Sequence, residues 1–95
     1  MAILMILEVP GGTTDQYDKV NELLGMQGND NAPDGLVSHT CAVTDDGILI
    51  ADVWESQEAL DRFFHDRLGA ALAGSGMPQS QPRVLSVHHT ISGSA

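Results

Sequence analysis

Two residues able to carry acid–base chemistry lie on neighbouring apolar stretches of the chain. His39 stands between two small polar residues, Ser38 and Thr40, and Asp52 lies in the apolar stretch that follows. A carboxylate paired with a histidine orients the imidazole, which can then take a proton from a phenol or a carbon acid as a general base. The pattern predicts His39 and Asp52 as catalytic residues. A hydrogen bond that only supports the structure explains the same pair.

Whether the two residues meet depends on the turn between them. Residues 44–47, with the letters TDDG, predict a β-hairpin in which Gly47 takes a positive φ. If the loop includes all four residues, His39 lies opposite Asp52 on one face of the sheet. With a three-residue loop His39 faces Val53 and Asp52 points the other way, because side chains alternate along a strand. The sequence leaves both registers open.

Trp54 follows Asp52 by two residues, so both side chains are expected on the same face of a strand. An indole supplies a large apolar wall and one hydrogen-bond donor, which suits an aromatic ligand. The residue is therefore predicted to bind substrate. Plain core packing or a dimer contact accounts for it equally well.

The remaining reactive residues lack the spacing that their chemistry requires. No His-x-His, Cys-x-x-Cys or His-Glu-x-x-His pattern occurs, so no metal site is predicted. Cys41 is the single cysteine and is expected to be a buried filler inside a strand. Gly11 and Gly12 lack the rest of any phosphate-binding motif. The adjacent His88 and His89 point to opposite faces of a strand, so they cannot chelate one metal together.

Charge and composition exclude several classes of partner. The 95 residues carry 13 acidic side chains against 4 basic ones, for a net charge of −9. Such a surface repels nucleic acids and anionic membranes, and neither is expected as a partner. A lone cysteine and the lack of a signal-peptide pattern at the start favour a cytoplasmic location. The length suits one domain, predicted over 1–91, with a flexible C-terminal tail over 92–95.

Hydrophobic periodicity predicts four strands and two helices in the order βαββαβ. The strands are expected at 2–9, 36–44, 48–54 and 83–91. Thr13 and Gln16 form a capping-box pattern at the start of the first helix, and Ser56 caps the second. The fold class is therefore α+β, a ferredoxin-like arrangement in which both helices cover one face of a four-stranded antiparallel sheet.

The apolar residues also indicate what covers each face of this sheet. The second helix carries an apolar stripe formed by Leu60, Phe63, Phe64, Leu68, Ala71 and Leu72. The strands are apolar on both faces, whereas a sheet that is wet on one side alternates polar and apolar residues. The face away from the helices needs a cover, and a second copy of the chain, giving a homodimer, is the simplest one.

Three segments of the sequence resemble a known family. Residues 35–39 (GLVSH), 52–56 (DVWES) and the pair Phe63-Phe64 are similar to the antibiotic biosynthesis monooxygenase-like, or ABM-like, group of dimeric α+β barrel proteins. The resemblance implies dimers in which two sheets face each other, with an apolar pocket between each sheet and its helices. It also implies that Tyr17, Phe64 and His88 line this pocket and bind substrate.

Members of this family use the pocket in different ways. Some oxidise polycyclic phenols with oxygen and no cofactor, and others degrade heme. The heme-degrading members have an axial histidine late in the second helix, but residues 70–74 contain none. The asparagine expected in the first strand is also missing from residues 4–9, which leaves His65 as a substitute in principle. No cofactor is therefore expected.

Two hypotheses of function follow. In the first, the protein is a cofactor-independent monooxygenase, or a cyclase or isomerase, acting on an aromatic or polyketide-like substrate with His39 as the base. In the second, it is a non-catalytic dimeric module for ligand binding or assembly. A cavity that reaches His39 and Trp54 favours the first hypothesis, and a fully packed interior favours the second.

Overall fold

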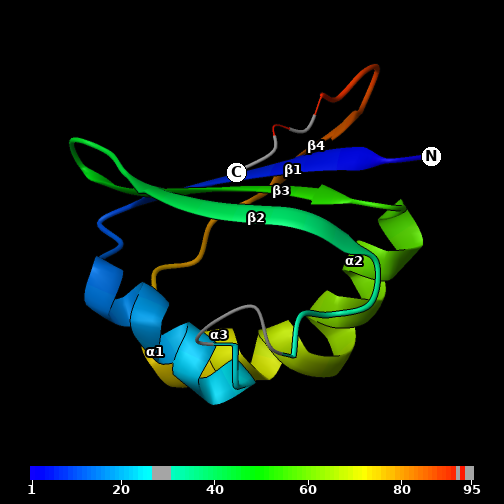
Figure 1. The fold of residues 1–95 in the computed structure, drawn as a ribbon. Helices are drawn as coiled ribbons and strands as arrows, with labels where there is room; N and C mark the ends of the chain where they lie inside the picture. Colours follow the sequence, from blue (N-terminus) through cyan, green and yellow to red (C-terminus); the bar gives the residue numbers. More distant parts are fainter. Residues whose placement is uncertain (27–30, 92, 94–95) are drawn as a thin grey trace.

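The computed structural model of the chain describes residues 1–26, 31–91 and 93. One antiparallel sheet with the strand order β2-β3-β1-β4 carries all of the helices on one of its faces (Figure 1). The elements are β1 (Ile3–Pro10), α1 (Thr14–Leu24), β2 (Leu36–Val43), β3 (Gly47–Trp54), α2 (Gln57–Phe63), η1 (Phe64–Leu68), α3 (Gly69–Ser75) and β4 (Arg83–Ser86). The predicted βαββαβ order and the α+β, ferredoxin-like class are confirmed.

Helix α1 begins at the predicted capping box. The Thr13 hydroxyl accepts a hydrogen bond from the Gln16 backbone N–H, and the Gln16 side chain accepts one from the Thr13 N–H, each at 3.1 Å. The Gln16 side-chain amide also donates to the carbonyl of Gly76 at 3.1 Å, which ties the start of α1 to the end of α3. The helix stops at Gly25, whose φ of 72° lies in the left-handed region.

The hairpin between β2 and β3 has the longer loop, so His39 pairs directly with Asp52. The prediction that Gly47 takes a positive φ is wrong, because Gly47 is absent from the positive-φ residues of the described chain. Glycine is needed at this position because there is no room for a side chain. A Cβ at Gly47 would lie 2.1 Å from the carbonyl oxygen of Val9 on the neighbouring strand.

The second helix departs from regular α-helical geometry after Phe63. Residues 64–68 form the π-helical turn η1, which separates α2 from α3. Ala59, Leu60 and Phe63 are buried and define the inward face of α2, whereas Phe64 is 52% exposed. By helical geometry Phe64 is roughly a quarter turn away from the middle of that face. The expectation that Phe64 belongs to the buried stripe is therefore wrong.

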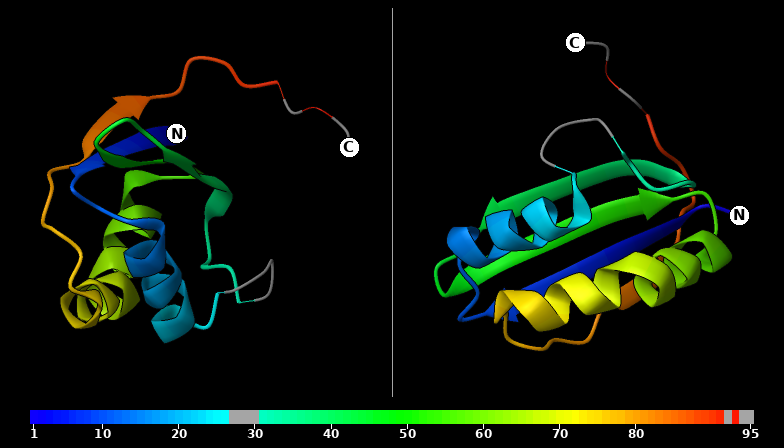
Figure 2. Two further views of the ribbon diagram at one scale, coloured as in Figure 1. Left: turned by 90° about the vertical axis from the view of Figure 1, so that its left-hand side faces the viewer. Right: turned by 90° about the horizontal axis from the view of Figure 1, so that it is seen from below.

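Strand β4 is shorter than the sequence predicts. It covers Arg83–Ser86 instead of 83–91, and one further backbone hydrogen bond joins the Val87 N–H to the Ala2 carbonyl at 3.0 Å. The physical reason is the end of its partner: Ser86 pairs with Ile3 at the start of β1, so later residues have no strand beside them. The chain beyond β4 runs away from the sheet (Figure 2).

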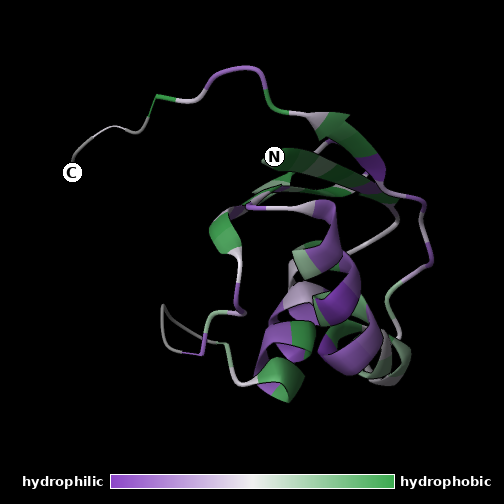
Figure 3. Cartoon of the chain, turned by 90° about the vertical axis from the view of Figure 1, so that its right-hand side faces the viewer, coloured by the Kyte–Doolittle hydropathy of each residue, from purple (hydrophilic) through white to green (hydrophobic). Residues whose placement is uncertain are grey.

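The two faces of the sheet have different environments. The face under the helices holds the buried core, in which Val9, Ile48 and Trp54 are almost completely covered. The strands are mostly apolar, whereas the helices mix polar and apolar residues along their length (Figure 3). The other face is left partly exposed by this chain, and we call it the open face; its large or central apolar residues are Leu4, Ile6, Leu49, Ala51, Val53 and Leu85, and polar residues lie toward its edges. Within the described ranges, no helix is long and apolar enough to span a membrane.

The close approach at Gly47 generates a stability prediction. Gly47→Ala should lower the free energy of unfolding by about 1–3 kcal/mol, the usual cost of overpacking, because the new methyl group meets backbone atoms that cannot rotate away. Urea denaturation followed by circular dichroism measures this. Gly93→Ala is the matched control, since a Cβ there meets nothing within 4 Å. Equal stability of the two variants would contradict the packing argument.

Candidate functional site

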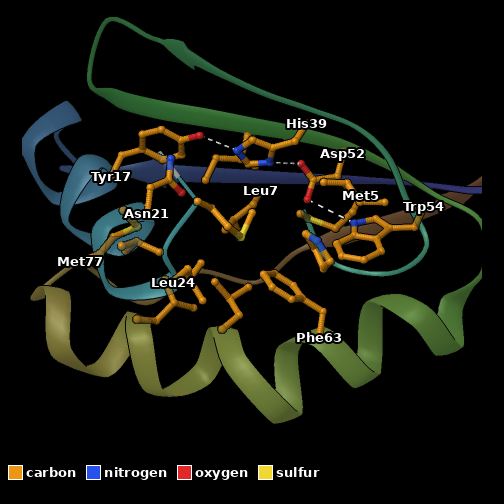
Figure 4. A pocket seen from close by; sticks show the side chains of 17 residues that line it. Met5, Leu7, Tyr17, Asn21, Leu24, His39, Asp52, Trp54, Phe63 and Met77 are labelled. Atoms are coloured by element: carbon orange, nitrogen blue, oxygen red, sulfur yellow. Dashed lines mark hydrogen bonds and ion pairs between the residues drawn. The ribbon is translucent and has the colours of Figure 1, made fainter. Parts of the chain in front are cut away.

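Four side chains form a continuous hydrogen-bonded row between the sheet and the helices (Figure 4). The Tyr17 hydroxyl lies 2.5 Å from His39 Nε2, and His39 Nδ1 lies 2.5 Å from Asp52 Oδ1. The indole N–H of Trp54 donates to the second oxygen, Asp52 Oδ2, at 3.2 Å. We call this set, Tyr17, His39, Asp52 and Trp54, the polar row.

The fold positions each member through a different element. Asp52 and Trp54 are two residues apart on β3, so both point from the sheet toward the helices. His39 comes from the edge strand β2, directly opposite Asp52. Tyr17 comes from the first turn of α1, immediately after the capping box, and its ring stacks on the His39 imidazole with the two planes 8° apart. The row therefore exists only when sheet register and helix start are both correct.

The partners of each atom define a consistent proton arrangement. Asp52 is 5% exposed and is the one buried charged or polar residue of the described chain. Its carboxylate accepts from Trp54, and it accepts from His39 when the imidazole carries its proton on Nδ1. In that tautomer Nε2 is an acceptor, and the Tyr17 hydroxyl donates to it. Burial raises the pKa of the Tyr17 hydroxyl, so at neutral pH it retains its proton.

A small cavity of about 60 Å³ borders the polar row. Its walls are largely apolar and include Met5, Leu7, Leu24, Ile50, Phe63 and Met77. All four members of the polar row and the amide of Asn21 also line it. No lysine or arginine lies among the lining residues within the described part of the chain. The cavity thus offers an apolar space with one polar wall, the usual make-up of a site for a small organic molecule.

Two residues predicted to bind substrate lie elsewhere. Phe64 starts the π-helical turn and does not line the cavity, whereas its neighbour Phe63 does, with its ring 5.4 Å from that of Trp54. His88 follows β4 and borders a shallow hollow on the open face instead. Both placements correct the expectation. Tyr17 and Trp54 do line the cavity, and the roles of all these residues in binding or catalysis stay predictions.

Some lining residues were missed by the sequence reasoning. Asn21 lies one helical turn after Tyr17, so the i, i+4 spacing on α1 was the signal that would have found it. Met26 and Met77 come from the segments that follow α1 and α3, where no periodicity applies. Burial raises the pKa of the Cys41 thiol, which disfavours the reactive thiolate. Across the described residues, no group of three potential metal-ligating side chains comes together.

Comparison with known proteins supports the fold. No family model matches the chain, and no curated protein matches it. Several solved structures are similar to the chain. The monooxygenase from the gene ActVA-Orf6 of Streptomyces coelicolor, in complex with nanaomycin D, is 20% identical with a TM-score of 0.60; the match covers 98% of this chain and 92% of that one.

Two further structures are similar to a comparable degree. The cofactor-independent oxygenase SnoaB from Streptomyces nogalater is 15% identical with a TM-score of 0.59, covering 97% of this chain and 96% of that chain. A point mutant of MhuD, with two manganese protoporphyrin IX molecules per active site, is 18% identical with a TM-score of 0.60, covering 97% and 98%. The chain therefore has the α+β fold of the ABM-like proteins, which confirms at the level of the fold the resemblance seen in its sequence.

The bond between Trp54 and Asp52 generates a prediction about stability. Trp54→Phe keeps an aromatic ring in the core but removes the indole donor, which leaves one buried carboxylate oxygen without its partner. The free energy of unfolding should fall by about 1–3 kcal/mol, measured by chemical denaturation. The control compares three variants: Trp54→Phe, Asp52→Leu and the double variant that carries both substitutions. If the two single losses simply add in that double variant, the hydrogen bond does not couple the residues.

Proposed function

We propose that the protein binds a small aromatic or polyketide-like molecule in the cavity between sheet and helices and acts on it without a cofactor. His39 is the general base, and Asp52 holds the imidazole in the tautomer whose Nε2 carries no proton and can accept one. The observation that carries the proposal is the polar row itself. A buried carboxylate, an imidazole and a phenol are aligned along the wall of an otherwise apolar cavity.

The charges of the site favour a neutral ligand. The Asp52 carboxylate lies on the cavity wall, and the described lining residues include no lysine or arginine to balance a second anion. A ligand that arrives as a carboxylate or phosphate would therefore be repelled or left unpaired. A hydroxyarene or an aryl ketone with an acidic C–H arrives neutral and becomes charged only when His39 takes its proton.

The size of the cavity sets a condition on binding. About 60 Å³ is far below the roughly 300–1,000 Å³ of a typical ligand site. Three methionines, Met5, Met26 and Met77, lie in the wall, and their unbranched side chains can adopt other rotamers at low cost. In this proposal the ring of the ligand gains its space by displacing these side chains.

The proposed reaction is an oxygenation in which the substrate supplies the electrons. His39 removes a proton from a CH₂ group made acidic by a neighbouring carbonyl or arene. The resulting carbanion reduces dioxygen, the CH₂ becomes a carbonyl, and the second oxygen atom leaves as water. Isomerisation or cyclisation would use the same first proton transfer without oxygen.

Replacing the base tests this mechanism. With anthrone as the probe, the wild type should form anthraquinone and consume oxygen, and His39→Gln should lower that rate by about 10²–10⁴-fold, the usual contribution of a general base. Product chromatography and an oxygen electrode measure the two quantities. His65→Gln is the matched control, because the His65 side chain is 90% exposed and lies outside the cavity.

A thermal-shift measurement on the same variants separates binding of anthrone from its turnover. Anthrone should raise the melting temperature of both the wild type and His39→Gln, since a bound ligand stabilises the folded state. Full anthrone turnover by His39→Gln would remove His39 from the mechanism.

Heme does not fit the site. Residues 70–74 of α3 contain no histidine, and His65 is exposed and pairs with Asp66 at 3.1 Å outside the cavity. The cavity is also much smaller than a porphyrin. We therefore derive no step through heme for this chain, although MhuD has the same fold.

The small cavity gives the second candidate function its support. A non-catalytic module for ligand binding or assembly needs no room for a polycyclic substrate, and the polar row would then serve the structure alone. Absence of anthrone binding together with a clear loss of stability in His39→Gln would favour this alternative, because the variant removes a bond to the buried Asp52.

The proposal includes a homodimer formed through the open face, located in the cytoplasm. Leu4, Ala51 and Val53 lie at the middle of that face and remain partly accessible in a single chain. A second copy would cover them and supply the burial that a domain of this size lacks. The half-buried free thiol of Cys41 fits a reducing compartment.

A charge placed on the open face tests the dimer. Val53→Glu should convert the protein from dimer to monomer at micromolar concentration, because a carboxylate in an apolar interface would lose its water without gaining a partner. Light scattering after size exclusion measures the mass. Val43→Glu is the matched control: Val43 is 73% exposed and pairs with Ile48, on the side of the sheet that faces the helices. A wild type that runs as a monomer would contradict the dimer outright.

A further inference from the structure

We propose that Tyr17 is the residue that meets the acidic group of the ligand, and that the proton reaches His39 through the Tyr17 hydroxyl. This inference rests on the proposed function and gives the Tyr17 hydroxyl of the polar row a catalytic role in proton transfer.

The first argument is that both nitrogens of His39 are already engaged. Nδ1 faces Asp52 at 2.5 Å, and Nε2 faces the Tyr17 hydroxyl at 2.5 Å. The tyrosine ring also stacks on the imidazole, with the ring centres 5.8 Å apart. A ligand therefore finds the tyrosine hydroxyl in front of the only nitrogen of His39 that can accept a proton.

The second argument is that Tyr17 is firmly placed. Its backbone N–H donates to the Thr13 carbonyl at 3.0 Å, and it follows directly on Gln16, which closes the capping box and bonds to Gly76. Swinging the side chain aside would break its bond to His39 and its stacking contact. Passing a proton along the existing bond requires neither change.

The third argument is chemical. A hydroxyl can accept one proton while it donates another. The ligand O–H or C–H gives its proton to the Tyr17 oxygen, and the proton already on Tyr17 moves to His39 Nε2. The products are a ligand anion, a neutral Tyr17 and a His39 imidazolium facing the Asp52 carboxylate. One proton changes place in total and no electron is transferred.

The state of the tyrosine is consistent with this exchange. Burial raises the pKa of Tyr17, which opposes a lasting tyrosinate, so the residue returns to its neutral form after each transfer. The Trp54 N–H donates to the second oxygen of Asp52, which holds the carboxyl group in place beside His39.

Tyr17 and Trp54, the two ends of the polar row, can each be observed separately by spectroscopy. Tyr17 is the only tyrosine of the chain and Trp54 is its only tryptophan. Fluorescence of the protein therefore reports on Trp54, and a 3-fluorotyrosine label gives one ¹⁹F signal, from position 17. The probe ligand is 4-nitrophenol, which turns yellow only when it loses its proton.

The experiment measures binding and proton transfer separately in the full chain. Quenching of Trp54 fluorescence reports that 4-nitrophenol is bound. At a pH low enough for the free probe to remain neutral, absorbance of the phenolate reports that the bound probe has lost its proton to the protein. The wild type should bind the probe largely as phenolate. Tyr17→Phe and His39→Gln should still quench Trp54, but the ionised fraction of bound probe should fall at least about tenfold in each. His65→Gln should match the wild type.

The ¹⁹F signal supplies a test that needs no variant. In fluorotyrosine-labelled protein with the native residues elsewhere, 4-nitrophenol should shift the signal, whereas 4-nitroanisole, which has no hydroxyl, should shift it much less. This measurement decides the question even if Tyr17→Phe does not fold.

Three outcomes would overturn the inference in distinguishable ways. A Tyr17→Phe variant that binds 4-nitrophenol as phenolate as fully as the wild type would show that His39 takes the proton directly. Equal ¹⁹F shifts with the two nitroarenes would show that the ligand hydroxyl does not touch Tyr17. No quenching of Trp54 in the wild type would contradict the proposed ligand binding itself, and the relay would fall with it.

Discussion

The buried carboxylate of Asp52 is the interaction on which the rest of the site depends. A charge removed from water is costly unless it is paired and hydrogen-bonded, and Asp52 meets that condition through His39 on one oxygen and Trp54 on the other. Trp54 lies on the same strand as Asp52, but His39 is within reach only in the observed register of β2 against β3. A slip of β2 by one residue would turn His39 toward the open face and leave Asp52 without this partner, so register and site are specified together.

Backbone contacts around the hairpin between β2 and β3 fix the register that pairs His39 with Asp52. The Thr44 N–H donates to the Gly47 carbonyl at 2.9 Å, and the backbone of Gly11 donates to Asp46 at 2.7 Å. Gly47 itself lies against the Val9 carbonyl without room for a side chain. These contacts lie far from the polar row along the strands, yet they set the pairing that brings His39 and Asp52 together.

Proteins with this fold bind different small molecules, as nanaomycin D in one neighbour and a metalloporphyrin in another illustrate. Fold alone does not decide among such functions; the side chains of the site do. In this chain the deciding features are an acidic residue inside the sheet–helix layer, a tyrosine from α1 that reaches it through His39, and a second helix without an axial histidine. These features support the proposed proton transfer with a neutral organic ligand rather than a porphyrin site.

The sequence by itself determined the order of the elements and the faces of the strands. Local chemistry was sufficient there: the capping box of Thr13 and Gln16 marked the start of α1, and the two-residue spacing of Asp52 and Trp54 put them on one side. Only the tertiary structure decided which loop closes the hairpin, whether Phe63 or Phe64 faces the cavity, and where β4 loses its partner. It also brought Tyr17 to His39, across 22 positions. Periodicity reports which side of an element is apolar, but register, helix phase after a π turn and contacts between distant elements depend on the packing of the whole chain.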